Sequence, residues 1–238
     1  MKQPSKKPPA VAEPAGDFTA DRGDATRQKL LTAAIDVFGQ YGFDGTTTRA
    51  LASAAGVNLQ AIPYYFGGKE GLYLATADHL ATMITSHLGG RRQQIQARLA
   101  AIAAEGRPMT RDEARELLTG LLHATAEMMV SEKSRAWARF IIREQMTPTE
   151  AFSRLYDAVM QPMLEAGSKL VSVLMNESPN SERVRLRTLS LLGSIMVFRV
   201  ANAAALRQLE WAEMGPRELE AIRSLVTEIV GSLDRGVV

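Results

Sequence analysis

A short stretch near the N-terminus, GVNLQAIPYYFGGKEGLY (residues 56–73), carries side chains suited to reading a nucleic acid. Asn58 and Gln60 have amides, which can pair with the edge of adenine in the major groove of DNA. Ala61 and Pro63 are small and uncharged, so they allow a close approach to the bases. The stretch therefore predicts a helix whose outer surface contacts base edges.

Residues on either side of this surface have groups that suit phosphate oxygens. Tyr64 and Tyr65 carry phenol hydroxyls, and Lys69 adds a cation at the start of the following helix. Thr47 and Thr48 begin an earlier short helix, where hydroxyls and free backbone N–H groups favour an anion. The alternative is that the aromatic side chains only pack a small helical domain. For Tyr65 the sequence leaves both roles open.

Other chemistry finds little support in the sequence. There are no cysteines, which excludes disulfides, thiol catalysis and cysteine-based zinc sites. The histidines are His79, His87 and His123, and they form no H-E-x-x-H motif. Phosphate-binding glycine loops and the G-x-S-x-G elbow are also absent. We expect neither an enzyme nor a cofactor. An interaction adaptor or an architectural DNA binder without an effector is the remaining alternative.

The composition is that of a folded protein, with 238 residues, 46% hydrophobic and 23% charged, and a formal net charge of +2. Residues 1–23 are rich in proline, lysine and acidic side chains. We expect a disordered arm there, either a solvated tail or an arm that touches DNA. The arm lacks the apolar run of a signal peptide, and no stretch is long and apolar enough to span a membrane. The sequence therefore predicts a cytoplasmic protein without membrane contact.

Helical periodicity extends over nearly all of the chain from Asp24 onward, and strand signals are absent. The predicted fold class is therefore all-α. Glycines and prolines mark the ends of the helices, and Pro162 is a candidate kink. The expected helices are 24–41, 47–55, 57–65, 69–104, 111–130, 134–143, 149–175, 181–211 and 216–233.

The second and third of these helices are short and are joined by a turn at Gly56, as in a helix-turn-helix. At this point the chain resembles the DNA-binding domain of the TetR family of bacterial transcriptional regulators. The resemblance rests on A-x-x-x-F-x-x-x-G-F-x-x-T-T at residues 34–47, A-x-x-A-G-V at 52–57, and YYF followed by K-E-x-L-Y at 64–73. Residues 24–70 would form this domain, and 71–238 would bind an effector and form a dimer.

Two departures from the family pattern concern the predicted reading helix. Pro63 stands where the family usually has a tyrosine, and a proline cannot donate a hydrogen bond to the DNA backbone. Leu59 and Ala61 replace the lysine or threonine typical of the start of this helix. The operator sequence must differ accordingly.

The segment RAWARFIIREQMTPTEAFSRLYDAVMQPM (residues 135–163) resembles the C-terminal domain of a subgroup related to CecR. The resemblance implies a homodimer built from the last two long helices and a pocket for a small-molecule effector. Apolar stripes fit the dimer, and methionines and aromatics suit a pocket for apolar ligands, although all of them also fit an ordinary core. The candidate dimer residues are Leu192, Met196, Val200 and Ile222. The candidate effector residues are Met128, Trp137, Phe140, Ile141, Phe152, Tyr156 and Met160.

The resemblance implies a ligand-responsive repressor. The ligand-free dimer would bind a pseudo-palindromic DNA operator, and a small apolar effector would release it by favouring a state with wrongly spaced reading helices.

Overall fold

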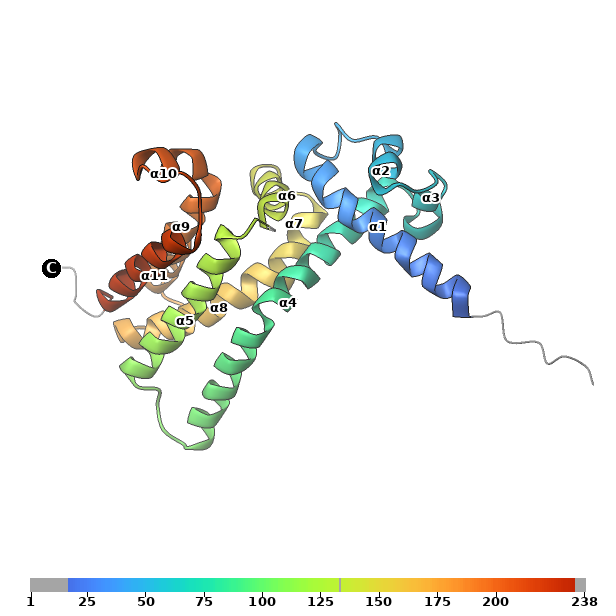
Figure 1. Ribbon diagram of the computed structural model, residues 1–238. Helices are drawn as coiled ribbons and strands as arrows, with labels where there is room; N and C mark the ends of the chain where they lie inside the picture. The colour runs from blue at the N-terminus through green and yellow to red at the C-terminus, as the bar shows by residue number, and fades with distance from the viewer. Residues whose placement is uncertain (1–16, 133, 234–238) are drawn as a thin grey trace, which may run out of the picture.

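The computed structural model describes residues 17–132 and 134–233, and within them the chain is helical without a strand (Figure 1). This confirms the predicted all-α fold class. The helices are α1 (Asp17–Tyr41), α2 (Thr48–Ala55), α3 (Ala61–Phe66), α4 (Lys69–Ala104), α5 (Arg111–Val130), α6 (Ser134–Met146), α7 (Glu150–Leu155), the π-helical turn η1 (Tyr156–Met160), α8 (Gln161–Met175), α9 (Glu182–Val200), α10 (Asn202–Gln208) and α11 (Pro216–Gly231).

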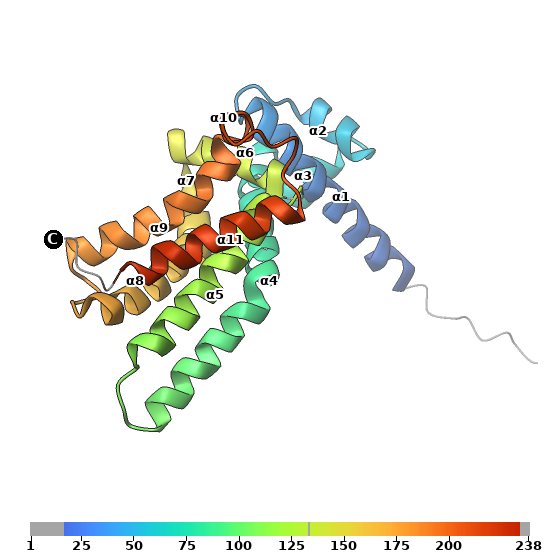
Figure 2. The same cartoon turned by 60° about the vertical axis from the view of Figure 1, so that its left-hand side comes forward.

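Helices α1, α2 and α3 gather at one end of the molecule, and the long helix α4 leads away from them into the rest of the chain (Figure 1). Helices α5, α8, α9 and α11 pack against one another as a second bundle. In the turned view, α11 lies across α5 and beside α9 (Figure 2). Two cores result, one around α1–α4 with α6 and α7, and one between α5, α8, α9 and α11.

Helix α1 ends, and helix α2 begins and ends, close to where the sequence predicts. Phe38 is fully buried on the inner face of α1, and Gly42 follows this helix with φ 73°. Thr47 caps α2 by accepting a hydrogen bond from the backbone N–H of Ala50. Gly56 ends α2 in the left-handed conformation, with φ 63°. A glycine accepts this conformation without the steric cost of a Cβ.

Two predicted boundaries in the outer parts of the chain are wrong. Helix α1 begins at Asp17, so residues 17–23 of the predicted disordered arm are helical, while residues 1–16 lie outside the described chain. The predicted helix 181–211 breaks at Ala201, whose φ of −107° and ψ of 36° are not helical. As a result, α9 and α10 meet at an angle of 86°.

The predicted kink near Pro162 takes the form of the π-helical turn η1. Proline has no N–H to donate to the carbonyl of Ala158 four residues earlier, and its ring crowds that carbonyl. The chain widens to bonds five residues apart, as when the N–H of Gln161 donates to the carbonyl of Tyr156. Such turns are often found at functional sites.

A buried carboxylate joins α6 to α4 and α7. Glu144, near the end of α6, is only 1% exposed. Its Oε1 accepts a hydrogen bond from the hydroxyl of Tyr73 in α4, and its Oε2 accepts bonds from the N–H and the hydroxyl of Thr149, at 3.1 and 2.9 Å. Thr149 in turn caps α7. Burial, followed by the bond to Glu144, raises the pKa of Tyr73, so the phenol stays protonated as a donor.

We expect Tyr73→Phe to lower the free energy of unfolding by about 1.5–3 kcal/mol, because a buried carboxylate loses one of its donors. The measurement is the urea midpoint at constant slope. Tyr41→Phe is the matched control, since Tyr41 is 55% exposed. Equal urea midpoints for the two variants would show that the hydrogen bond from Tyr73 to Glu144 adds nothing to the free energy of unfolding.

Candidate DNA-binding interface and effector region

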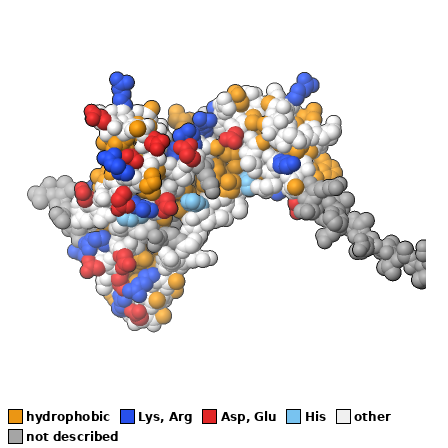
Figure 3. Space-filling model, viewed as in Figure 1, with side chains coloured by type: hydrophobic (Ala, Val, Ile, Leu, Met, Phe, Trp, Pro, Cys, Tyr) orange, Lys and Arg blue, Asp and Glu red, His pale blue; other side chains and the backbone are white. Residues whose placement is uncertain are grey.

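The predicted reading surface consists of Asn58, Gln60, Ala61, Pro63 and Tyr64. Apart from the half-buried Ala61, all of these side chains are exposed. The neighbouring Ile62 is fully buried and holds α3 against the core. In the space-filling view the end of the molecule formed by α1–α3 is mostly uncharged (Figure 3). The reading surface is therefore free to meet a partner.

The local geometry of this surface differs from the prediction in one respect. Helix α3 begins at Ala61, so residues 57–60 form the turn rather than the first helical turn. The side-chain oxygen of Asn58 accepts a hydrogen bond of 2.9 Å from the N–H of Gln60. This bond fixes the orientation of Asn58 and occupies an acceptor, which leaves its NH2 group as the donor toward a base. Gln60 makes no side-chain cap bond.

Helix α1 contributes two residues that the sequence analysis did not select. Thr26 and Lys29 line a shallow hollow of about 470 Å³ together with Asn58, Gln60 and Tyr64. Their spacing of three residues along one helix was the available signal, but without the structure nothing placed that face of α1 beside α3. Lys29 is exposed and adds a positive charge next to the reading surface.

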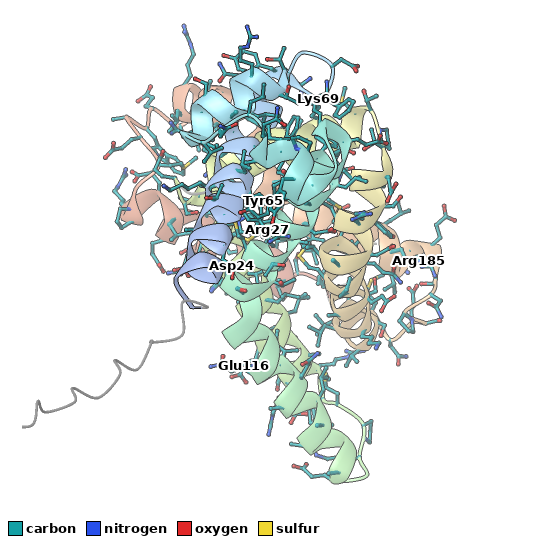
Figure 4. The ribbon with its side chains drawn as sticks, turned by 90° about the vertical axis from the view of Figure 1, so that its right-hand side faces the viewer. Asp24, Arg27, Tyr65, Lys69, Glu116 and Arg185 are labelled. Carbon is teal, nitrogen blue, oxygen red and sulfur yellow. The ribbon has the colours of Figure 1, made fainter. Side chains whose placement is uncertain are left out.

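The two tyrosines at the end of α3 are not equivalent. Tyr64 is 80% exposed, whereas Tyr65 is half-buried. Their rings meet edge to face, with centroids 4.8 Å apart. The Tyr65 hydroxyl lies beside Gly23 of α1, so close that a Cβ there would be 3.2 Å away. Figure 4 shows Tyr65 beside α1, near Arg27. Tyr64 is thus the better placed of the two to meet a phosphate.

Helix α2 presents its first turn at the same end of the molecule. Thr47 is exposed and Thr48 is half-buried. The oxygen of the Thr47 hydroxyl already accepts the bond from Ala50, at 3.1 Å, so its hydrogen is the part that can donate outward. This arrangement suits one phosphate oxygen at the start of the helix.

Lys69 has a different setting from the one predicted. Its ammonium donates to the backbone carbonyls of Phe43 and Thr46, both at 3.0 Å, and lies 4.2 Å from the centre of the Phe43 ring. Two of its three donors are therefore used to tie the loop before α2 to the start of α4. These contacts point to a role in positioning α2 rather than in binding phosphate.

The predicted effector residues do not line one common cavity. Met128, Trp137 and Ile141 border a hollow of only about 40 Å³. Phe140 is 1% exposed and packs against Tyr73, with ring centroids 5.0 Å apart. The remaining three residues lie on α7 and η1. The rings of Phe152 and Tyr156 have centroids 5.8 Å apart, and the Met160 sulfur accepts a 3.4 Å hydrogen bond from the Gln145 amide. Most of the methionine and aromatic side chains predicted to bind an effector are therefore packed against other side chains. Larger hollows are lined by residues of α8.

The predicted dimer residues also separate into two groups. Leu192 and Ile222 are 7% and 1% exposed and belong to the core of their own chain, so they are unavailable to a partner. Met196 is half-buried, and Val200 is 55% exposed. The outward stripe of α9 consists of Leu186, Leu189, Val197 and Val200.

Within the described ranges, no group of three or more His, Asp or Glu residues could hold a metal ion. No single described helix is long and apolar enough to cross a bilayer; α9 and α10 meet the criterion only as a pair, bent by 86°.

Comparison with known proteins agrees with the exposed three-helix unit. A family model described as bacterial regulatory proteins, tetR family, matches residues 30–76. A second, described as the C-terminal domain of the HTH-type transcriptional dual regulator CecR, matches residues 114–237. The CecR regulator of Shigella flexneri is 30% identical over 206 residues, which cover 87% of this chain and 90% of that protein.

Solved structures show the same fold. FadR of Bacillus subtilis, in complex with stearoyl-CoA, has a TM-score of 0.56 and 13% identity, covering 89% of this chain and 99% of that one. AibR, in complex with isovaleryl coenzyme A and operator DNA, has a TM-score of 0.60 and 12% identity, covering 86% and 97%.

The fold and its exposed short helix define a helix-turn-helix transcriptional regulator. The chain belongs to the TetR family, and its C-terminal domain is of the CecR type. Members of this family regulate transcription and are not enzymes.

The contacts of Lys69 generate a test of its role. We expect Lys69→Met to lower the free energy of unfolding by about 1–3 kcal/mol, because two carbonyls lose their donor. Lys29→Met, at an exposed position, should change it by less than about 0.5 kcal/mol. Thermal unfolding of both variants measures this difference. An unchanged unfolding temperature for Lys69→Met would return Lys69 to the candidate phosphate contacts.

Proposed function

We propose that this regulator is a cytoplasmic homodimeric repressor that leaves a pseudo-palindromic operator when a small effector binds its C-terminal domain. The observation that carries the proposal is the exposed reading surface on α3 and the turn before it. Asn58 and Gln60 offer amides to base edges, and Ala61 and Pro63 leave space for the groove. Donors to phosphates come from the hydroxyl of Tyr64 within this surface, from Lys29 of α1, and from Thr47 and Thr48 at the start of α2.

The apolar stripe on α9 supports a dimer. Leu186, Leu189, Val197 and Val200 are 45–56% exposed and recur every three or four residues, apart from a gap at Gly193. Leu225 of α11 is also 40% exposed. Apolar side chains that line up on an exposed helix favour contact with another protein surface. A two-fold axis at α9 and α11 would place two reading helices on successive turns of DNA, about 34–36 Å apart or a multiple of it.

Helix α4 is the element that can carry a signal between the two ends. Its first turns hold Tyr73, which bonds Glu144, and Asp78, which pairs with Arg154 of α7 at 2.7 Å. Its far half reaches the C-terminal bundle. A ligand that shifts α7 or α4 would therefore reorient the reading surface of α3.

The proposed release requires only unequal affinity for two states. An effector that binds the DNA-free state about 100-fold more tightly supplies about 2.7 kcal/mol of coupling. The structures of FadR with stearoyl-CoA and AibR with isovaleryl-CoA and DNA support the idea that this fold holds a small ligand and an operator. Electrophoretic mobility and transcription assays with the operator would distinguish repression from activation.

Two substitutions on the reading surface test the DNA-binding proposal. Gln60→Ala should relax base preference at one operator position and cost about 1–3 kcal/mol on the preferred sequence. Tyr64→Phe should weaken binding by a similar factor on all sequences, because a phosphate bond carries no base information. Selection of bound fragments followed by fluorescence anisotropy measures both effects. Wild-type affinity and preference in both variants would remove α3 from the interface.

The dimer has its own test in the exposed stripe. Val197→Glu should raise the dimer dissociation constant by about 100-fold or more, since a carboxylate would be buried at an apolar contact. Leu209→Glu is the control, because Leu209 is 44% exposed but lies beyond the bend at Ala201. Sedimentation equilibrium distinguishes the two. If Val197→Glu remains as dimeric as the control, the dimer uses another surface.

A further inference from the structure

A mainly apolar hollow of about 300 Å³ lies between α4, α5 and α8. Leu88, Ile95 and Leu99 of α4 form one wall, and Leu121 of α5 forms another. Val159 of η1 also lines the hollow. This volume is at the lower end of known ligand pockets. Most of the residues that line the hollow are apolar, and the polar ones are Thr85, Gln96, Glu165 and Lys169.

The π-helical turn is part of this hollow. Ala158 and Pro162, the pair whose α-helical hydrogen bond cannot form, both line it. The turn therefore moves side chains away from the regular helical positions at the point where the hollow opens. The same turn continues α7, whose Arg154 pairs with Asp78 of α4.

A second, more polar hollow of about 600 Å³ adjoins the first. Glu165 and Lys169 line both hollows, and Arg185 of α9 adds a second cation to the polar one. Among the described residues, neither cation forms an ion pair with a carboxylate; Arg185 only donates to the Asn180 side chain at 3.3 Å. Glu165 accepts a bond from the Gln161 amide at 2.9 Å. Figure 4 places Arg185 away from the end of the molecule that carries Tyr65.

We propose that the effector site consists of these two hollows and that the effector is an anionic amphiphile. Its apolar body occupies the hollow between α4, α5 and η1, and its carboxylate or phosphate group lies between Lys169 and Arg185. The inference deepens the proposed function and rests on it. It differs from the apolar effector expected from the sequence, because the cations of Lys169 and Arg185 in the polar hollow would have no counter-charge on an uncharged ligand.

The charges also give the site its selectivity. Two cations and the single carboxylate of Glu165 leave a local excess of positive charge, which favours an anion over an alcohol or an ammonium of the same shape. Tyr156 and Leu189 line the polar hollow as well, and Leu189 belongs to the proposed dimer stripe. A head group bound there lies at the edge of the dimer contact, where it can alter the distance between the reading helices.

The test uses four probes with the same chain of about ten carbons: decanoate, decyl phosphate, decanol and decyltrimethylammonium. Isothermal titration of the full-length protein measures the dissociation constant of each. We expect at least one anion to bind about tenfold or more tightly than decanol, as one charge-assisted hydrogen bond would give. The comparison of decanoate with decyl phosphate identifies the preferred anion. Decyltrimethylammonium should bind more weakly than decanol.

Point variants assign the charge effect to the site. Lys169→Gln and Arg185→Gln should each remove most of the preference for the anion, and Glu165→Gln should increase it. Arg183→Gln is the matched control, since Arg183 lies on the same first turn of α9 and pairs with Glu177 at 2.6 Å. Ala166→Phe should weaken all four probes by narrowing the apolar hollow. Circular dichroism and the unfolding temperature verify that each variant is folded.

Equal affinity for decanol and both anions, or a preference that persists in Lys169→Gln and Arg185→Gln alike, would overturn the proposal. So would the absence of binding by all four probes. None of these results touches the DNA-binding test, because Gln60→Ala and Tyr64→Phe are measured on DNA without ligand. Loss of DNA binding alone would instead remove the proposed function and leave an anion-binding protein.

Discussion

The carboxylate of Glu144 is the buried group on which the placement of α4 relative to α6 and α7 depends. A carboxylate without hydrogen bonds in an apolar interior costs several kcal/mol, so its donors must remain in place. The donors come from Tyr73 in α4 and from Thr149 at the start of α7. Any movement of α4 relative to α6 and α7 must therefore keep these bonds or replace them, which favours discrete arrangements over gradual deformation.

The packing around Glu144 adds to this constraint. Tyr73 lies edge-on to Phe38 of α1, with centroids 4.7 Å apart, and close to Phe140 of α6. Helices α1 and α6 approach closely at Gly39, where a Cβ would meet the Arg139 side chain at 3.3 Å. The N-terminal unit is thus held to the C-terminal domain through an aromatic cluster and a close helix contact. The orientation of the reading surface is set by these same contacts.

The sequence was sufficient for the fold class, for the end of α1 and for both ends of α2. Gly42, Thr47 and Gly56 act through short-range backbone chemistry, so their roles follow from residue type and spacing. The bend at Ala201 carries no such signal, because alanine favours a helix and the break depends on tertiary packing. Lys69 was assigned to phosphate for a similar reason: only the folded chain brings the carbonyls of Phe43 and Thr46 to its ammonium.

Helical periodicity could not predict the proposed dimer and effector residues of the C-terminal domain, for a different reason. Helix α9 is apolar on two faces, with Leu191, Leu192 and Ile195 turned inward and Leu189 and Val197 turned outward. A stripe read from such a helix has no unique register, so the predicted dimer set mixed both faces. Met128, Trp137 and Phe140 are apolar, as are most of the side chains that line the hollow between α4, α5 and α8. Composition selects residues that avoid water, but only three-dimensional packing distinguishes a filled core from a space.

In the proposed mechanism, the position of the hollow connects the ligand to the DNA-binding helices through two elements. Ile95 and Leu99 of α4 line it, and Tyr73 lies on the same helix near the opposite end. On the other wall, η1 continues α7, whose cap at Thr149 is bonded to Glu144. A ligand between α4 and η1 therefore acts on both elements that supply donors to the buried carboxylate. Because loss of these donors would leave a buried carboxylate unpaired, the proposed mechanism expects a small displacement at the hollow to favour one of two orientations of the reading surface.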